Sequence, residues 1–191
     1  MNVSRRSFLA GSGLVIGIAI SPKAFAQTLL QGEPADVQGP HRDLNAFVRV
    51  APDGTVTILS KHLEMGQGPY TGLATLVAEE LDADWSQMRT AAAPANDDIY
   101  KNLALGLQAT GGATSIANSY EQLRKAGATA RAMLVAAAAD RWGVPASQIE
   151  VKKGVVSHAA SGRKTDFGAL ADKAATMTPP AEPKLKDPAD F

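Results

Sequence analysis

The sequence predicts an α+β fold, an α/β sandwich in which helices pack on two β-hairpins. Segments of alternating apolar and polar residues flank turns that contain Pro and Gly, and two long segments place apolar residues at helical spacing. The regular strand–helix rhythm of a doubly wound parallel sheet is missing. The chain has 191 residues, 45% hydrophobic and only 5% aromatic, which favours a core of closely packed helices over one of large rings.

The first half of the predicted core contains a hairpin, a helix and a strand. The hairpin covers residues 45–50 and 55–60 around a Pro-Asp-Gly turn at 52–54. A helix is expected over 69–81, because apolar residues recur there at helical spacing, and its first residue is a proline, which suits the first helical position. A short strand should follow at 85–92. The apolar stripe of the helix consists of Leu73, Leu76, Val77 and Leu81.

The second half begins with the longest predicted helix, over residues 115–141, which ends before the Gly-Val-Pro segment at 143–145. Gly127 on its apolar face should let a neighbouring element approach closely. A second hairpin is expected over 148–151 and 155–158. The apolar stripe of the long helix consists of Ile116, Tyr120, Leu123, Gly127, Ala130, Leu134 and Ala137.

Composition divides the chain into four parts. Residues 1–26 form an export signal and residues 27–44 a flexible lead-in with several Gly and Pro. Residues 45–175 form the folded domain, which should end in a short helix near 167–174. Residues 176–191 contain four prolines and many charges, so we expect a linker that leads to further domains.

The N-terminus has the organisation of an export signal. Arg5 and Arg6 are followed by Phe-Leu, by a moderately apolar run at 14–20, and by a small-x-small cleavage segment at 24–26. This order indicates twin-arginine export to the periplasm, with cleavage after Ala26. The apolar run is too short and too rich in glycine for a membrane span, so no span is expected after cleavage.

Charge and residue usage exclude several classes of function. Lys plus Arg equal Asp plus Glu at 19 each, so no charge excess indicates nucleic-acid binding. The chain has no cysteine, which excludes disulfides, thiolate metal sites and iron–sulfur ligation by this chain. Its three histidines are scattered, and His62 with Glu64 would give only two ligands, so no metal site is expected.

Two glycine-rich turns carry the candidate chemistry. The first turn, residues 64–72, has the sequence Glu-Met-Gly-Gln-Gly-Pro-Tyr-Thr-Gly, and the second turn, residues 108–115, has Gln-Ala-Thr-Gly-Gly-Ala-Thr-Ser. Both turns lead into predicted helices, whose first N–H groups and positive dipole ends suit phosphate or another anion. Gln67 and Gln108 can both donate and accept hydrogen bonds, which matches the edge of a pterin or a nucleobase.

Spacing alone leaves a binding role and a structural role equally open for these turns. The first turn has one residue more than the dinucleotide-binding fingerprint, and neither turn has the Gly-Lys-Ser/Thr of a P-loop. Glycines also commonly turn a chain or end a helix. Two such turns in one small domain favour a phosphorylated cofactor.

Four segments resemble a known family: Asn-Ala-Phe-Val-Arg-Val at 45–50, Lys-His-Leu-Glu-Met-Gly-Gln-Gly at 61–68, Leu-Val-Ala-Glu-Glu-Leu at 76–81, and the paired glycines at 111–112. They are similar to the start of the mature large subunit of the isoquinoline 1-oxidoreductase and membrane-bound aldehyde dehydrogenase type. This type belongs to the xanthine dehydrogenase and aldehyde oxidase superfamily. The resemblance covers nearly all of residues 45–191.

The resemblance implies that residues 45–175 are a partial molybdopterin-binding domain. In the family both turns hold the pyranopterin and its phosphates, often as the cytosine dinucleotide. Relatives commonly place a hydroxyl residue after the paired glycines, where this chain has Ala113, so Ala113 could contact the cofactor only through its backbone. Carried over by motif, the cofactor contacts are Gly66, Gln67, Gly68, Thr71, Gly112, Ala113, Thr114 and Ser115.

The resemblance also implies an enzyme of which this chain is only a part. The catalytic glutamate of the family lies far downstream, so no catalytic residue is expected here and the chain should be inactive alone. Glu79 and Glu80 are expected to solvate a helix face or to form a structural pair. The intact protein would oxidise an aldehyde or an N-heterocycle with water-derived oxygen. Its implied partners are the remainder of the large subunit, a small [2Fe-2S] subunit and a cytochrome c subunit.

Two alternatives remain open from the sequence. The chain could be a free-standing periplasmic module that binds a nucleotide-like ligand or a partner protein. It could also be the non-functional remnant of an interrupted gene, whose apolar docking faces would lack their covers.

Overall fold

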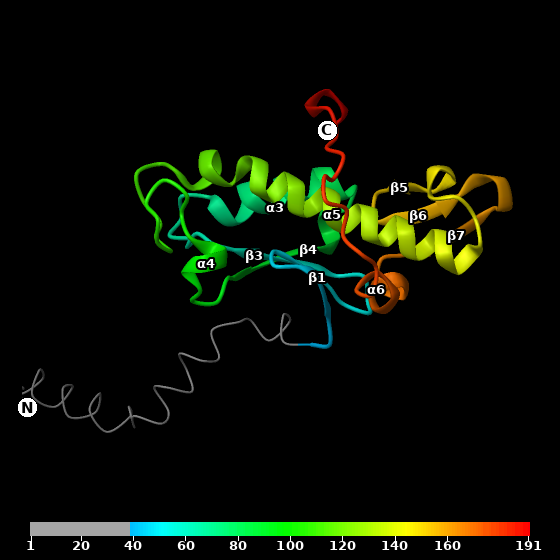
Figure 1. The fold of residues 1–191 in the computed structure, drawn as a ribbon. Helices are drawn as coiled ribbons and strands as arrows, with labels where there is room; N and C mark the ends of the chain where they lie inside the picture. The colour runs from blue at the N-terminus through cyan, green and yellow to red at the C-terminus, as the bar shows by residue number, and fades with distance from the viewer. Residues whose placement is uncertain (1–38) are drawn as a thin grey trace, which may run out of the picture. The chain divides into compact units, whose positions relative to one another are not determined.

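The computed structural model describes residues 39–191 (Figure 1). The predicted export signal and most of the predicted lead-in lie outside these residues. Within them, helices and two β-sheets share a hydrophobic core, which confirms the predicted α+β class. No helix in this part of the chain has both the length and the apolar character needed to cross a membrane.

The first sheet has four strands in the order β1-β2-β3-β4. The first three strands pair antiparallel, whereas β4 runs parallel to β3. β3 is one of the two inner strands of the sheet, and all five of its residues are buried. The strands are β1 (Arg42–Asn45), β2 (Val48–Val50), β3 (Val56–Ser60) and β4 (Met88–Ala92).

The sequence predicts only the β2–β3 hairpin and one further strand in this sheet. β1 begins inside the segment predicted as lead-in, and Leu44 is its one fully buried residue, so its period-two pattern is too weak to detect. The strand predicted at 85–92 starts later, because a 3-10 turn, η2 (Trp85–Gln87), precedes β4. Asp84 caps this turn by accepting the Ser86 N–H at 2.9 Å.

The second sheet has three antiparallel strands in the order β5-β6-β7. They are β5 (Glu150–Lys152), β6 (Val155–His158) and β7 (Arg163–Asp166). The predicted second hairpin is confirmed as β5–β6, and its turn residues Lys153 and Gly154 have φ of 48° and 73°, as a type I′ turn requires. β7 was not predicted, because the sequence Arg-Lys-Thr-Asp contains no apolar residue.

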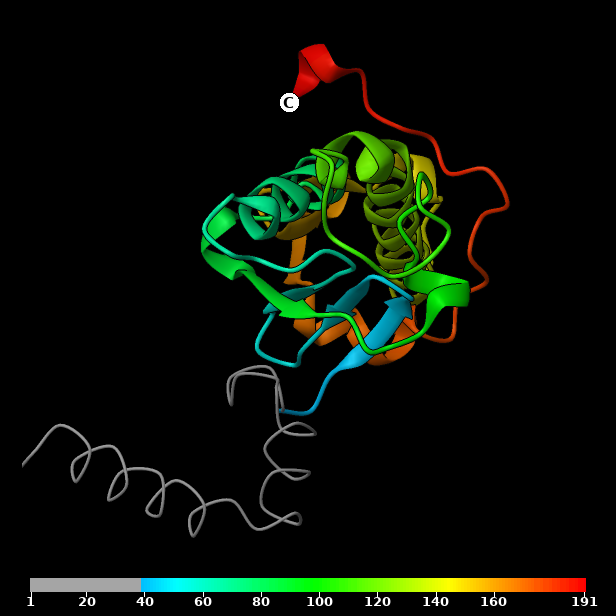
Figure 2. The ribbon, with the colours of Figure 1, turned by 90° about the vertical axis from the view of Figure 1, so that its left-hand side faces the viewer.

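Two parallel helices, α3 (Pro69–Leu81) and α5 (Ser115–Trp142), lie side by side over the first sheet (Figures 1 and 2). Both match their predicted ranges to within one residue. Short helices α4 (Asp97–Tyr100) and α6 (Gly168–Ala174) complete the core. Further 3-10 turns are η3 (Ala146–Gln148), η4 (Ala159–Ser161) and η5 (Pro188–Asp190).

The two parallel helices meet at Gly127. A Cβ on this residue would lie 2.9 Å from both the Val77 carbonyl oxygen and the Glu80 Cβ, so only glycine allows this approach. The predicted stripe of α5 is buried from Leu123 onward. Its first turn differs, because the side chains of Ile116 and Tyr120 are each 40% exposed.

A buried ion pair locks α3 to α5. The Glu80 carboxylate is fully buried and accepts a hydrogen bond of 2.6 Å from the Arg124 guanidinium. Of the two roles expected for Glu80, solvation of a helix face or a structural pair, the structure therefore shows the pair. The same carboxylate accepts the Lys186 N–H at 3.0 Å, and Arg131 donates to the Lys184 carbonyl at 3.0 Å. The C-terminal segment is thus held against the helix pair. The division into a domain at 45–175 and a linker at 176–191 stays a prediction.

Candidate functional site

The fold brings the two glycine turns together at the starts of α3 and α5. The Leu63 N–H, just before the first turn, donates to the Thr110 hydroxyl of the second turn at 2.8 Å. A Cβ on Gly72 would lie 2.7 Å from the Ile116 Cδ1, which shows how closely the two helix starts approach. The eight residues proposed as cofactor contacts therefore gather at one end of the helix pair.

The first turn closes on its own carboxylate. Glu64 accepts hydrogen bonds from the backbone N–H groups of Gly66 (2.6 Å), Gly68 (3.1 Å) and Tyr70 (3.2 Å). These bonds, that from Gly68 foremost, hold the pKa of the Glu64 carboxyl below its usual value of 4.5. The turn therefore has the geometry of an anion site, and a side chain of the same chain fills it.

The Gln67 side chain is also engaged within the first turn. Gln67 accepts from the Met65 N–H at 2.5 Å and donates to the Leu63 carbonyl at 2.9 Å. The space beside Gly66 and Gly68 is open, because no other atom lies within 4 Å of a Cβ built on either residue. A ligand could therefore pack closely against the backbone of the first turn. Both glycines have positive φ, 93° and 89°, so larger residues would be strained there.

The second turn has open donors. Gly112 and Ala113 have φ of 64° and 54°, and α5 starts at Ser115 without a side-chain cap from Thr114. In the described part of the chain, the N–H groups of Gly112, Ala113 and Ser115 donate no hydrogen bond. No atom lies within 4 Å of a Cβ built on Gly111, so a ligand could approach this backbone closely. Free N–H groups at the positive end of a long helix suit an anion.

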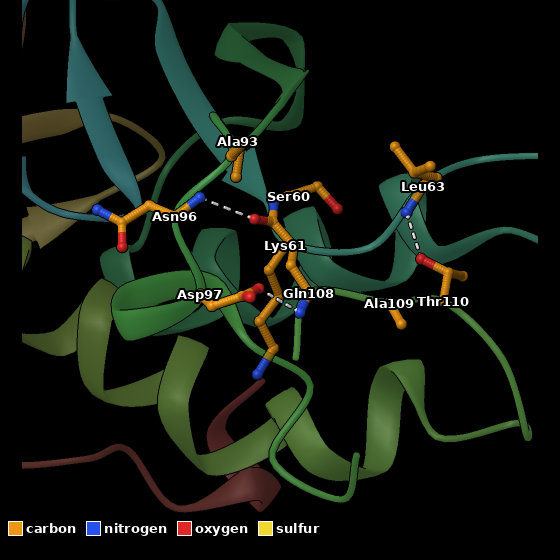
Figure 3. Close-up of a pocket in the computed structure, with 10 residues that line it drawn as sticks. Ser60, Lys61, Leu63, Ala93, Asn96, Asp97, Gln108, Ala109 and Thr110 are labelled. Atoms are coloured by element: carbon orange, nitrogen blue, oxygen red, sulfur yellow. Dashed lines mark hydrogen bonds between the residues drawn. The ribbon is translucent and has the colours of Figure 1, made fainter. Parts of the chain in front are cut away.

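A cavity of about 490 Å³ lies beside the turns, where the parallel strands β3 and β4 end (Figure 3). Leu63 and Thr110 line one side of the cavity, and Asn96 and Asp97 line the other. Gln108 is tied into this wall, because its side chain accepts the Asn96 N–H at 3.0 Å and its own N–H donates to Asp97 at 2.5 Å. None of the eight carried-over contact residues lines this cavity.

Three polar residues are buried behind the turns, a position that the sequence did not predict for any of them. Lys61 donates to the Gln122 side chain at 2.7 Å, and burial lowers the pKa of its ammonium. His62 is fully buried, and neither ring nitrogen forms a hydrogen bond of normal geometry. Burial, and then the charge of Lys61, lower the pKa of His62, so the imidazole is neutral near pH 7. Asn102 is also fully buried.

No metal-binding cluster occurs among residues 39–191. No three His, Asp or Glu side chains in this range converge as metal ligands would. His62 lies in the core, whereas the Glu64 carboxylate faces the backbone of the first turn, so the two do not form a metal pair. The arrangement can bind and orient an anionic ligand.

Comparisons with known proteins agree with a cofactor-binding role. The molybdopterin cofactor-binding domain family matches residues 3–190. The beta subunit of isoquinoline 1-oxidoreductase from Brevundimonas diminuta is 41% identical over 174 residues, which are 89% of this chain and 22% of that protein. The membrane-bound aldehyde dehydrogenase (pyrroloquinoline-quinone) from Gluconacetobacter polyoxogenes is 30% identical over 175 residues, covering 90% of this chain and 21% of that protein.

Two further proteins are similar over shorter parts. One of the subunits of nicotinate dehydrogenase from Pseudomonas putida is 34% identical over 134 residues, which are 68% of this chain and 10% of that protein. In the crystal structure of quinoline 2-oxidoreductase from Pseudomonas putida 86, one chain aligns with 71% of this chain and 17% of its own length, at 21% identity and a TM-score of 0.43. This chain thus spans about a fifth of the two relatives that match it over most of its length.

The family match extends over almost the whole chain and includes both glycine turns. The open glycine faces and the unused N–H donors fit the ligand that this family binds. The chain belongs to the molybdopterin cofactor-binding domain family of the molybdenum hydroxylases.

Proposed function

We propose that this chain is the first cofactor-binding domain of a periplasmic molybdenum hydroxylase, and that its second turn binds an anionic group of molybdopterin. The observation that carries this proposal is the set of unused N–H donors at Gly112, Ala113 and Ser115, at the start of α5. Phosphate is the ligand that such a helix start accommodates best. Cofactor analysis of the native protein distinguishes molybdopterin itself from its cytosine dinucleotide form.

The two turns would share the ligand unequally. The second turn would supply N–H donors, with the Ser115 hydroxyl beside them. The first turn would supply close packing against Gly66 and Gly68, with the exposed Thr71 next to them, because its own N–H donors are used by Glu64. Gln67 can reach a pterin edge only if it gives up its bonds within the turn.

The role of this chain would be binding and orientation. When bound, the cofactor of such enzymes supplies oxidation of an aldehyde or an N-heterocycle with oxygen from water. We place the catalytic glutamate in a later part of the large subunit, outside these residues, so the chain alone should be inactive. The partners would be the rest of that subunit, a small [2Fe-2S] subunit and a cytochrome c subunit.

The periplasmic location rests on the twin arginines and the small-x-small segment that ends at Ala26. Twin-arginine export usually carries proteins already folded around a cofactor, which agrees with a cofactor-binding chain. Processing after Ala26 can be read from the N-terminal sequence of the mature protein. A mature chain that still begins at Met1 would contradict this part of the proposal.

The experiment that tests the function is to detect the native protein with an antibody and to measure molybdenum in the same periplasmic fraction. We expect a band several times heavier than 19.9 kDa that co-elutes with molybdenum. A stable band at or just below 19.9 kDa without molybdenum would contradict the proposal and favour a free-standing module or a remnant.

A matched pair of variants ties the result to the second turn. Gly112 and Gly143 have nearly equal φ, 64° and 66°, so a valine strains the backbone similarly at both positions. Gly143 lies at the far end of α5, away from the turns. We expect Gly112→Val to lose molybdenum and Gly143→Val to retain it.

A further inference from the structure

Asn102 is a buried residue behind the second turn that no cofactor motif includes. Its side chain has no exposed surface. Its backbone also closes the short loop that follows α4: its N–H donates to the Leu107 carbonyl at 2.9 Å, and its carbonyl accepts from Leu105 and Gly106 at 3.1 and 2.8 Å. A buried amide with several partners orients whatever it binds.

The side chain of Asn102 is the centre of a directional hydrogen-bond relay. The Asn118 amide donates to the Asn102 Oδ1 at 3.1 Å, and the Asn102 Nδ2 donates to the Thr114 hydroxyl at 2.7 Å. The Thr114 hydroxyl in turn donates to the Gly111 carbonyl at 2.8 Å. The relay thus connects α5, the loop and the second turn, and it uses the only proton of the threonine hydroxyl.

This relay explains why α5 begins without a cap. A threonine at this position normally accepts a hydrogen bond from an N–H in the first helical turn. Thr114 makes no such bond, and its φ and ψ of −91° and −11° are helical rather than extended. Its oxygen faces Asn102 instead, so the N–H groups at the helix start remain unused.

We propose that Asn102 is a positioning residue, which holds the Thr114 hydroxyl away from the helix start and so keeps the second turn open for an anion. The inference rests on the proposed function of that turn. Without the Asn102 amide, the Thr114 hydroxyl would be free to accept an N–H of α5 and to compete with the ligand.

The test uses inorganic phosphate as the probe and follows the amide resonances of Gly112, Ala113 and Ser115 in the purified chain. We expect phosphate to shift these resonances in the unchanged chain. Asn102→Ala should weaken phosphate binding about tenfold, the equivalent of roughly one hydrogen bond. The matched control is Asn45→Ala, because the side chain of Asn45 makes two hydrogen bonds far from the turns, to the Ala126 carbonyl at 2.9 Å and from the Phe47 N–H at 3.0 Å.

A double variant separates positioning from simple support of the loop. If Asn102→Ala acts by releasing the Thr114 hydroxyl, removing that hydroxyl should restore the site. Thr114 is one of the contacts carried over by motif, but its hydroxyl proton is used by the Gly111 carbonyl and is not available to an anion. The Asn102→Ala, Thr114→Ala chain should then bind phosphate within about threefold of the unchanged chain. A purely structural role predicts the reverse, because the double variant loses more buried hydrogen bonds. Unrestored binding, or equal weakening by Asn45→Ala, would overturn the inference.

Hydrogen exchange keeps this result distinct from a failure of the proposed function. If phosphate shifts none of these resonances in the unchanged chain, the anion site of the second turn is wrong. Asn102 can still be judged, since its replacement should slow amide exchange at Ser115, Ile116 and Ala117 as Thr114 begins to cap the helix. Exchange that stays unchanged in Asn102→Ala would refute the positioning role whatever the ligand.

Discussion

The two glycine turns start parallel helices at neighbouring positions, yet their backbone donors are in opposite states. In the first turn, the N–H groups of Gly66 and Gly68 are bound by the Glu64 carboxylate. In the second turn, the N–H groups of Gly112 and Ala113 have no acceptor among the described residues. Both turns have two residues at positive φ, so backbone conformation is not what separates them.

The difference lies in the polar residue next to each set of glycines. Glu64 stands two residues before Gly66 and folds back over the turn. Thr114 stands two residues after Gly112, but its hydroxyl is directed to Gly111 and Asn102. Glycine content therefore indicates where a ligand can approach, whereas the nearest acceptor decides whether the donors are free to bind it.

The largest effect should come from a change that loosens the contact between α3 and α5, the two helices that the turns start. Glu80→Gln leaves Arg124 buried without its carboxylate, and breaking a buried ion pair in this way costs about 3–5 kcal/mol. We expect the free energy of unfolding in urea to fall by that amount, and amide exchange to accelerate in both turns together. Glu79→Gln is the matched control, because the side chain of this neighbouring residue takes no part in the Glu80–Arg124 ion pair. Loosening of one turn alone would show that the turns do not both depend on this contact.

The next effect should convert the first turn into a copy of the second. Glu64→Ala removes the acceptor of three N–H groups, so phosphate should now shift the resonances of Gly66 and Gly68 with an affinity about tenfold above that of the unchanged chain. Glu121→Ala removes another carboxylate, which pairs with Lys125 at 2.6 Å, and controls for the change in net charge. If both variants gain phosphate affinity equally, charge rather than turn geometry is responsible.

The sequence predicted the strongly periodic parts of the fold and missed the weakly patterned ones. The ranges of α3 and α5 were predicted almost to the residue, because apolar spacing, Pro69 and Gly143 mark them. β1 and β7 were missed, since β1 buries a single apolar residue and β7 has none. Such strands form because they pair with neighbouring strands in the sheet, and the local sequence pattern does not predict this pairing.

For the site, the sequence indicated where the turns are but not whether their backbone N–H groups are free to bind a ligand. Glycines and following helices are visible as spacing, and the fold does place the two turns side by side. Glu64 accepts the N–H groups of the first turn because its side chain folds back over that turn. The spacing of residues in the sequence does not predict this side-chain conformation. Asn102 acts from a separate loop through Thr114, a long-range contact that one sequence cannot reveal.

A smaller effect concerns His62, which is buried behind the turns. Its ring lies against the Asn118 side chain and the Ala109 backbone, next to Lys61, and burial lowers its pKa from 6.5. Below pH 6.5 the unfolded chain takes up a proton that the folded chain resists, so stability should fall as pH falls, by at most about 1.4 kcal/mol per pH unit. His62→Leu should remove this part of the pH dependence in urea unfolding between pH 7 and 5. Parallel pH profiles for both chains would show that His62 is not responsible.

The smallest effect isolates the one non-glycine residue that the second turn holds in a left-handed conformation. Ala113 has φ of 54°, a conformation that costs an alanine about 1 kcal/mol relative to glycine. Ala113→Gly should therefore raise the thermal midpoint by about 2–4 °C, as expected for a domain of this size. Phosphate binding should stay unchanged, because the N–H of residue 113 remains in place. A gain in stability together with a loss of phosphate affinity would mean that the strain at Ala113 itself holds the donors open, and that the second turn differs from the first by rigidity as well as by its acceptor.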